Sequence, residues 1–189
     1  MSMFKAVPLL MGAVLWAACG GGADSGQGSP SPSGPIASGE LTTFHSEEEG
    51  FSIGYPPDWT RQEGAFGSVV AFADAEHASG GFAPNVNVVV EELPSSDISQ
   101  DQYTEAALAQ LKNFITNLDN VEQNPSQLAG QPATEVTYTG TQGTSELRWL
   151  QVYTVAGDRA FVLTFTALPE QFDSVEPMAR QMFASFAIE

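Results

Sequence analysis

Alternating apolar positions predict that much of the chain beyond residue 50 forms β-strands. The alternation is clearest in segments rich in β-branched and aromatic residues, which are 51–55, 69–72, 85–91, 136–139, 146–155 and 160–167. A period of two places every second side chain on the same face of a strand. Leu147, Trp149, Tyr153 and Val155 share one face of the fifth segment, and Gln151 interrupts that face.

Two further segments carry the apolar spacing of an amphipathic helix. The first is 102–117, where apolar residues fall at steps of three and four, at Leu108, Leu111, Ile115 and Leu118. Ser99 or Asp101 can cap its N-terminus, because a short side-chain oxygen accepts hydrogen bonds from free backbone N–H groups. The second helix begins near Ser174 with Pro177 in its first turn, and its apolar stripe is Val175, Met178, Met182 and Phe183.

The order of these elements predicts an α+β fold in which helices flank an antiparallel sheet. Gly157-Asp158 separates the last two strand segments and is a two-residue hairpin signal. Parallel strands would need a helical crossover between each pair, and the chain has too few helical segments for that. We expect one globular domain over residues 41–189.

The N-terminal segment predicts export and lipid attachment. Residues 6–18 are apolar and uncharged, and a helix of that length is too short to cross a hydrocarbon core about 30 Å thick. We interpret residues 1–18 as a signal peptide. Residues 15–20 (LWAACG) resemble the lipobox of bacterial lipoproteins, which implies cleavage before Cys19 and a diacylglyceryl group on its thiol; Trp16 departs from the usual Leu. The alternative is an ordinary exported protein with a stray cysteine.

The segment that follows has the composition of a flexible tether. Residues 19–40 are rich in Gly, Ser and Pro and offer almost nothing to bury. Such a tether would hold the domain away from a membrane in which the acyl chains are anchored. Gly20 stands where lipoproteins of two-membrane bacteria often carry Asp for retention at the inner membrane, which favours the outer membrane in such a host. We expect a membrane-anchored, extracytoplasmic protein.

Charge and cysteine content then narrow the possible partners. The 189 residues include 6 Lys and Arg against 23 Asp and Glu, for a net charge of −17. Binding to nucleic acid phosphates needs clustered basic residues, so nucleic acid is excluded as a partner. A single cysteine excludes an internal disulfide and a multi-cysteine zinc site. The acidic surface either serves solubility, which we favour, or attracts a basic protein partner of unknown identity.

Residues 51–59 (FSIGYPPDW) resemble the opening signature of PsbP-like domains, an aromatic strand followed by a Tyr-Pro turn and a Trp. Further similarity covers 85–90, 128–133, 147–166 and 184–186, in the order of that family. The resemblance implies the antiparallel sheet flanked by helices that PsbP-like domains share with Mog1 and DcrB-type proteins. It also implies a non-enzymatic accessory role, which in plant and cyanobacterial members is the assembly of photosystem II or ion retention by it.

Two clusters near the opening signature are candidates for binding. Trp59 is a candidate partner contact, because Trp is favoured at interface hot spots, although packing beneath the turn is the preferred interpretation. Glu47, Glu48 and Glu49 with Asp58 could collect calcium, but no calcium-loop pattern is present and a solvated acidic turn is preferred.

His45, Glu76 and His77 are candidate ligands for a transition metal such as zinc, without cysteine partners to complete the set. The H-E-x-x-H motif of metalloproteases is absent from the sequence. The G-x-S-x-G spacing occurs at residues 50–54, but inside a predicted strand rather than on a strand-to-helix turn, and the S-x-x-K spacing occurs at residues 2–5, inside the predicted signal peptide, so we expect no enzyme. The sequence therefore predicts a docking or assembly module, and the alternative is a lipoprotein that binds a small ligand or a Ca, Mn or Zn ion.

Overall fold

The computed structural model describes residues 40–189. The predicted signal peptide, Cys19 and nearly all of the predicted tether lie outside these residues.

The main element is a seven-stranded sheet in which every neighbouring pair of strands is antiparallel. Its strands, in spatial order, are β3 (Thr60–Glu63), β4 (Val70–Ala73), β5 (Asn85–Glu92), β9 (Arg159–Ala167), β8 (Ser145–Ala156), β7 (Gln131–Gln142) and β6 (Thr116–Leu128). The antiparallel sheet and its flanking helices confirm the predicted fold class. The hairpin at Gly157-Asp158 joins β8 to β9 as expected.

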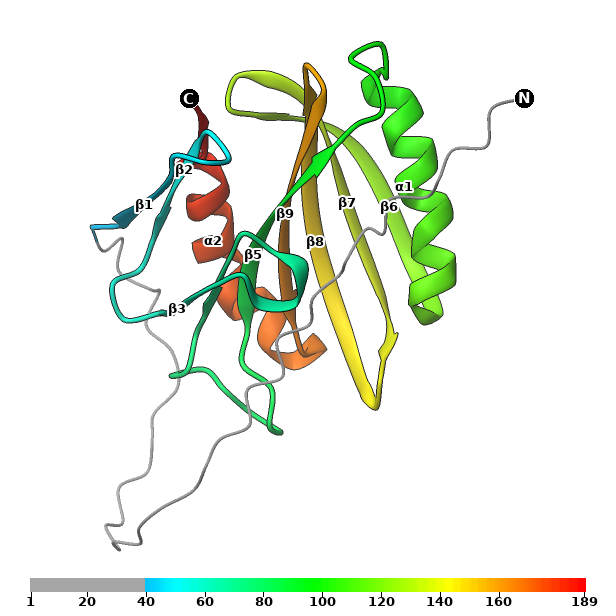
Figure 1. Cartoon of the computed structure of the whole chain (residues 1–189). Coiled ribbons are helices and arrows are strands. Elements are labelled where there is room, and N and C mark those ends of the chain that lie inside the picture. The colour runs from blue at the N-terminus through cyan, green and yellow to red at the C-terminus, as the bar shows by residue number, and fades with distance from the viewer. Residues whose placement is uncertain (1–39) are drawn as a thin grey trace, which may run out of the picture.

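A helix covers each face of this sheet (Figure 1). Helix α1 (Gln100–Phe114) lies on one face, and α2 (Pro169–Ala184) lies on the other. A smaller antiparallel sheet packs on the α2 side and consists of β1 (Thr42–Ser46), β2 (Phe51–Tyr55) and the C-terminal β10 (Ala187–Ile188). A short 3₁₀ turn, η1 (Ala65–Gly67), connects β3 to β4.

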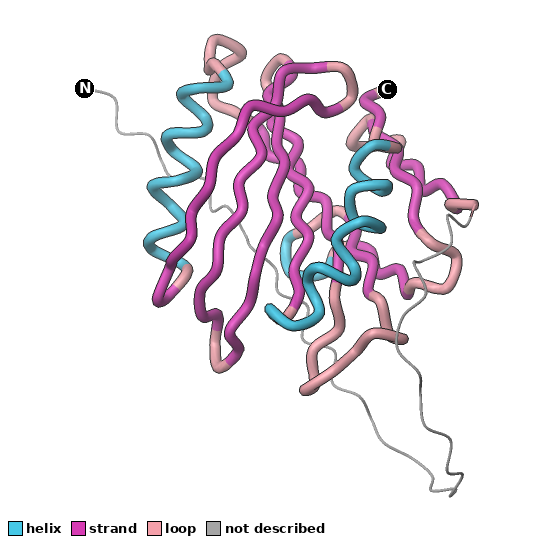
Figure 2. Tube along the Cα trace, turned by 180° about the vertical axis from the view of Figure 1, so that it is seen from behind, coloured by secondary structure: helices cyan, strands magenta, loops and turns pink. Residues whose placement is uncertain are grey.

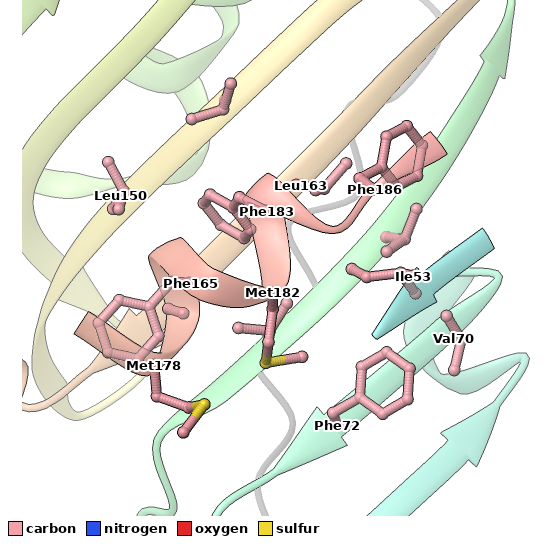
Figure 3. Close-up of a cluster of buried hydrophobic side chains, with 14 of the residues drawn as sticks. Ile53, Val70, Phe72, Leu150, Leu163, Phe165, Met178, Met182, Phe183 and Phe186 are labelled. Atoms are coloured by element: carbon pink, nitrogen blue, oxygen red, sulfur yellow. The ribbon is translucent and has the colours of Figure 1, made fainter. Parts of the chain in front are cut away.

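The larger core lies between the main sheet and the α2 side (Figure 3). Alternation directs Phe161, Leu163 and Phe165 of β9 into this core, where they are fully buried. Met178 and Met182 of α2 belong to the same cluster, and Figure 3 shows them beside Leu163 and Phe165. Aromatic rings of both sheets also meet here, which ties the small sheet to the large one.

The core beneath α1 is smaller and mixes aromatic with polar side chains. Tyr138 and Trp149 stack with ring centroids 5.0 Å apart, and Leu111 of α1 packs in the same cluster. Gln151, which interrupts the apolar face of β8, is 2% exposed and donates a hydrogen bond of 3.0 Å to Thr164. The polar residue that interrupts the apolar face therefore forms a buried pair with Thr164 on the neighbouring strand.

Both helices have different bounds from those predicted. The first helix starts at Gln100, because Ser99 and Gln102 form a reciprocal capping box, and it ends at Phe114, because Ile115 is extended. The second starts at Pro169 rather than near Ser174, so Pro177 lies inside the helix and not in its first turn. The side chain of Gln171 accepts the N–H of Leu168, which fixes this earlier start.

Strands β1, β3, β6 and β10 were not predicted by the alternation. β6 has the sequence TNLDNVEQNPSQL and is almost entirely exposed, so it has no buried face to impose a period of two. Register shifts also interrupt its pairing with β7, next to Asn117 and Asn120, which adopt positive φ angles.

Gly140 allows the segment after α1 to cross β7 at close range. A Cβ atom at this position would overlap Cγ2 of Ile115 and lie 3.1 Å from the carbonyl oxygen of Thr116. We expect Gly140→Ala to lower the free energy of unfolding by about 1–3 kcal/mol, because it overpacks this contact. Urea denaturation measures the change, with Thr137→Ala on the opposite face of β7 as control. Equal stability of the two variants would contradict the role of Gly140.

Candidate functional site

Trp59 lies in the larger core and not on the surface. Its backbone N–H donates to the carbonyl of Pro56 at 3.0 Å, which closes the turn after β2. The side chain is 7% exposed and packs in the α2-side cluster. This position fits the preferred packing role and leaves no exposed ring for a partner to bind.

The acidic residues considered for calcium are not brought together. Glu47, Glu48 and Glu49 lie in the turn between β1 and β2, whereas Asp58 follows the far end of β2. A five-residue strand spans about 17 Å, so the two ends cannot ligate one ion. Glu49 instead accepts a hydrogen bond from Arg159 through its backbone carbonyl at 2.9 Å.

The candidate transition-metal ligands are also apart. His45 lies on β1 and pairs with Glu189 at 3.0 Å, on an exposed surface. Glu76 and His77 lie in the loop that precedes β5, at the bottom of Figure 1 and away from β1. Between residues 40 and 189, no three His, Cys, Asp or Glu side chains are placed to hold a metal ion. The structure therefore does not bring His45 together with Glu76 and His77.

His77 has a different set of partners. The carboxylate of Asp74, which is 4% exposed, accepts the backbone N–H of His77 at 3.1 Å and contacts its ring Nδ1 at 2.7 Å. The side-chain amide of Gln171 donates to the carbonyl oxygen of His77. These contacts fasten the loop before β5 to the first turn of α2. The Asp-x-x-His spacing is the sequence signal that could have indicated the contact between Asp74 and His77.

We expect Asp74→Asn to lower the free energy of unfolding by about 1–3 kcal/mol, because the amide NH₂ cannot accept the second hydrogen bond from His77. Chemical denaturation of the full chain checks this value. Glu76→Gln in the same loop is the matched control, since that side chain is exposed and its replacement is expected to change stability by less than about 0.5 kcal/mol. A similarly small effect for Asp74→Asn would show that the contact does not hold the loop.

Glu91 is a buried carboxylate that sequence reasoning missed. It lies on β5 and is 7% exposed, and the hydroxyl of Tyr103 on α1 donates to its Oε2 at 2.9 Å. Its Oε1 atom is buried without a hydrogen-bond partner among the described residues. Burial raises the pKa of Glu91 from 4.5 to about 6, and the hydrogen bond from Tyr103 acts in the opposite direction. Burial, and then the charge of Glu91, raise the pKa of Tyr103.

Further polar contacts attach the start of α1 to the sheet. The side-chain amide of Gln100 donates to the hydroxyl of Thr134 at 3.0 Å and to the carbonyl of Tyr153 at 3.1 Å. Its carbonyl oxygen accepts the N–H of Val155 at 2.9 Å. The hydroxyls of Thr104 and Thr134 are 3.1 Å apart. The first turns of α1 are thus positioned mainly by hydrogen bonds.

The α2 side of the main sheet is uncovered over β6, β7 and the start of β8, as Figure 2 shows from behind. On β7, Thr137, Thr139 and Thr141 are half-buried and alternate with residues that face α1. Asn120 and Asn117, at the irregular part of β6, donate to the hydroxyls of Thr139 and Thr141 at 3.0 and 3.3 Å. We call this surface the open sheet face.

Carboxylates exceed basic groups around the open sheet face. Cross-strand pairing places Glu122 beside Thr137, Asp119 beside Thr139 and Glu146 beside Thr141, and all three carboxylates are exposed. The two arginines at its border are already engaged with carboxylates.

Arg180 binds both oxygens of Glu135, at 2.9 and 3.0 Å, and also Glu176. The hydrogen bonds to Glu135 are the main reason that the pKa of Arg180 is raised. Arg148 pairs with Asp173 at 2.8 Å. The region therefore holds six carboxylates against two guanidinium groups, which gives the open sheet face a negative potential.

The sequence profile of the PsbP family matches residues 39–188. The chain belongs to the PsbP family. This confirms the resemblance carried by the FSIGYPPDW segment and the elements after it. No curated protein sequence is significantly similar to the chain.

Solved structures of PsbP-like proteins share the fold at low identity. Cyanobacterial PsbP (CyanoP) from Synechocystis sp. PCC 6803 is 15% identical, with a TM-score of 0.59 over 84% of this chain and 98% of that one. LpqN, described as involved in cell envelope biogenesis of Mycobacterium tuberculosis, is 16% identical with a TM-score of 0.57, over 79% and 90%. PA94 of Pseudomonas aeruginosa, a putative regulator of unknown function, is 16% identical with a TM-score of 0.52, over 76% and 93%.

These identities establish the shared fold and not a shared partner. Within residues 40–189, neither helix has the length and apolar character needed to span a bilayer.

Proposed function

We propose that the protein is a non-catalytic accessory lipoprotein, anchored to a membrane through acylated Cys19, whose PsbP domain docks onto a basic protein outside the cytoplasm. Three observations support this proposal. Cys19 is the only cysteine and lies in a lipobox-like segment directly after an apolar stretch. The domain belongs to the PsbP family. One structural relative is described as acting in cell envelope biogenesis.

The open sheet face is the observation that carries the docking role. A half-buried row of threonines offers a polar surface, and the surrounding carboxylates outnumber the guanidinium groups. Such a surface complements a partner that presents Lys and Arg, and it would steer the encounter at low salt. The same charge repels anionic lipid headgroups, so the face is suited to a protein rather than to the membrane surface.

The length of the tether limits how far from the membrane the docking partner can lie. Two or more acyl chains anchor a protein stably, whereas one chain binds only marginally. A Gly/Ser-rich segment of the length of residues 19–40 has a root-mean-square span of about 25 Å. The domain would therefore search a thin layer above the membrane, which raises its local concentration toward a membrane-associated partner above that of a freely diffusing protein. A docking surface of modest intrinsic affinity is sufficient under these conditions.

We expect Cys19→Ser to move the protein from the membrane fraction to the aqueous fraction, because it removes the atom that carries the lipid. Fractionation of cells that express the full chain, with mass spectrometry of the N-terminal peptide, measures the location and the modification. Ser29→Ala in the predicted tether is the control and is expected to remain with the membrane. A free thiol at Cys19 in native protein would contradict the anchoring part of the proposal.

We expect Glu122→Gln combined with Glu146→Gln to weaken capture of the partner about 10-fold at low salt, because steering depends on the charge of the open sheet face. The measurement is quantitative crosslinking and pulldown from native membranes with the full chain. Asp101→Asn combined with Glu105→Gln removes the same charge from exposed positions on α1, on the opposite face, and is the matched control. Equal capture by both double variants, or no reproducible partner, would contradict docking at the open sheet face.

A further inference from the structure

Helix α1 is attached to the sheet by a narrow contact. Of its 15 residues, Tyr103, Thr104, Ala107 and Leu111 are buried. Only Leu111 among them is a large aliphatic residue, and the first turns depend on hydrogen bonds such as those of Gln100. A helix with few buried apolar groups is a segment that opens locally before the rest of the protein unfolds.

Glu91 lies directly beneath the first half of this helix. Its side chain shares a face of β5 with Val89, and the residue opposite on β9 is Ala160, so its neighbours within the sheet are apolar. The hydroxyl of Tyr103 donates to Oε2 at 2.9 Å, and Oε1 has no hydrogen-bond partner within the described chain. Detachment of α1 would return both carboxylate oxygens to water.

We propose that Glu91 makes the attachment of α1 to the sheet depend on pH: the helix is held when the carboxyl group is protonated and loosens when the group ionises. This is a property of the α1 face, which is separate from the open sheet face on the other side of the sheet.

The charged groups around Glu91 do not compensate its ionisation. Tyr103 is the titratable residue of α1 that contacts Glu91. The next titratable group is Tyr153 on β8, whose ring centroid lies 5.3 Å from that of Tyr103. Glu92 and its cross-strand neighbour Arg159 face the other side of the sheet, where Arg159 contacts the Phe161 ring. Within residues 40–189, no basic side chain forms an ion pair with Glu91.

The direction of the effect follows from proton binding. The pKa of Glu91 is about 6 with α1 in place and returns towards 4.5 when the helix detaches. The closed form therefore binds more protons between these values, so closure is favoured at low pH and weakens as pH rises through about 6. The opening equilibrium of α1 is expected to rise about 20-fold between about pH 4 and about pH 7.5, and then to level off.

Hydrogen exchange of the full chain tests this inference. Exchange rates of α1 amides, corrected for intrinsic chemistry, are compared with those of β9 amides across the pH range. We expect the protection of α1 to fall about 20-fold relative to β9, and Glu91→Gln to abolish this relative change. Glu92→Gln is the matched control, since it removes an adjacent charge on the opposite face, and it should retain the change.

Tyr103→Phe provides a second test that keeps the carboxyl group. It removes the hydroxyl that stabilises the ionised form, so we expect the midpoint of the α1 transition to move to higher pH. The inference is overturned if α1 and β9 change in parallel in the wild-type chain. It is also overturned if Glu91→Gln keeps the pH dependence, or if Tyr103→Phe leaves the midpoint unchanged.

Discussion

Burial of both faces of the central strands is the constraint on which the rest of the structure depends. On the α2 side, β9 contributes a continuous apolar set that includes Phe161 and Phe165. On the α1 side the same strands carry polar residues, and burial obliges these to bond with one another, as Gln151 does with Thr164 at 3.0 Å. A slip of one residue would exchange the two sets, so the polar pairs help to fix the register that the apolar core requires.

The two helices cover these faces in different ways. α2 buries seven residues, including Phe172 and Met182, and side-chain contacts fasten both of its ends. Gln171 holds the loop before β5, Arg148 lies 4.1 Å from the ring centroid of Phe172, and Arg180 binds Glu135 through two hydrogen bonds. α1 has a smaller apolar contact and a buried carboxylate beneath it. The α2 side is thus the fixed part of the domain, and the α1 side is the part whose stability environmental conditions can change.

The sequence predicted the central strands and the fold class because burial imposes a regular period on them. It did not reveal β6, because an exposed edge strand needs no alternation, nor the true start of α2, because Pro177 resembled a first-turn proline and is tolerated inside the helix. The residues of the candidate site were harder still to predict from the sequence. Glu91 and Tyr103 are 12 positions apart and meet only through the docking of α1, and no local pattern encodes that distance. The conspicuous His45 and His77 share no such contact.

The excess of acidic charge connects the fold to the proposed docking role. Five of the six basic residues lie in the described domain, and its arginines are engaged within the fold: Arg159, for example, donates to the carbonyl of Glu49. The remaining carboxylates repel one another, and the two cores must outweigh that repulsion. Salt screens this repulsion and equally screens the attraction of the open sheet face for a basic partner. Ionic strength should therefore act on folding and docking in opposite directions, which separates a loss of partner binding from a loss of structure.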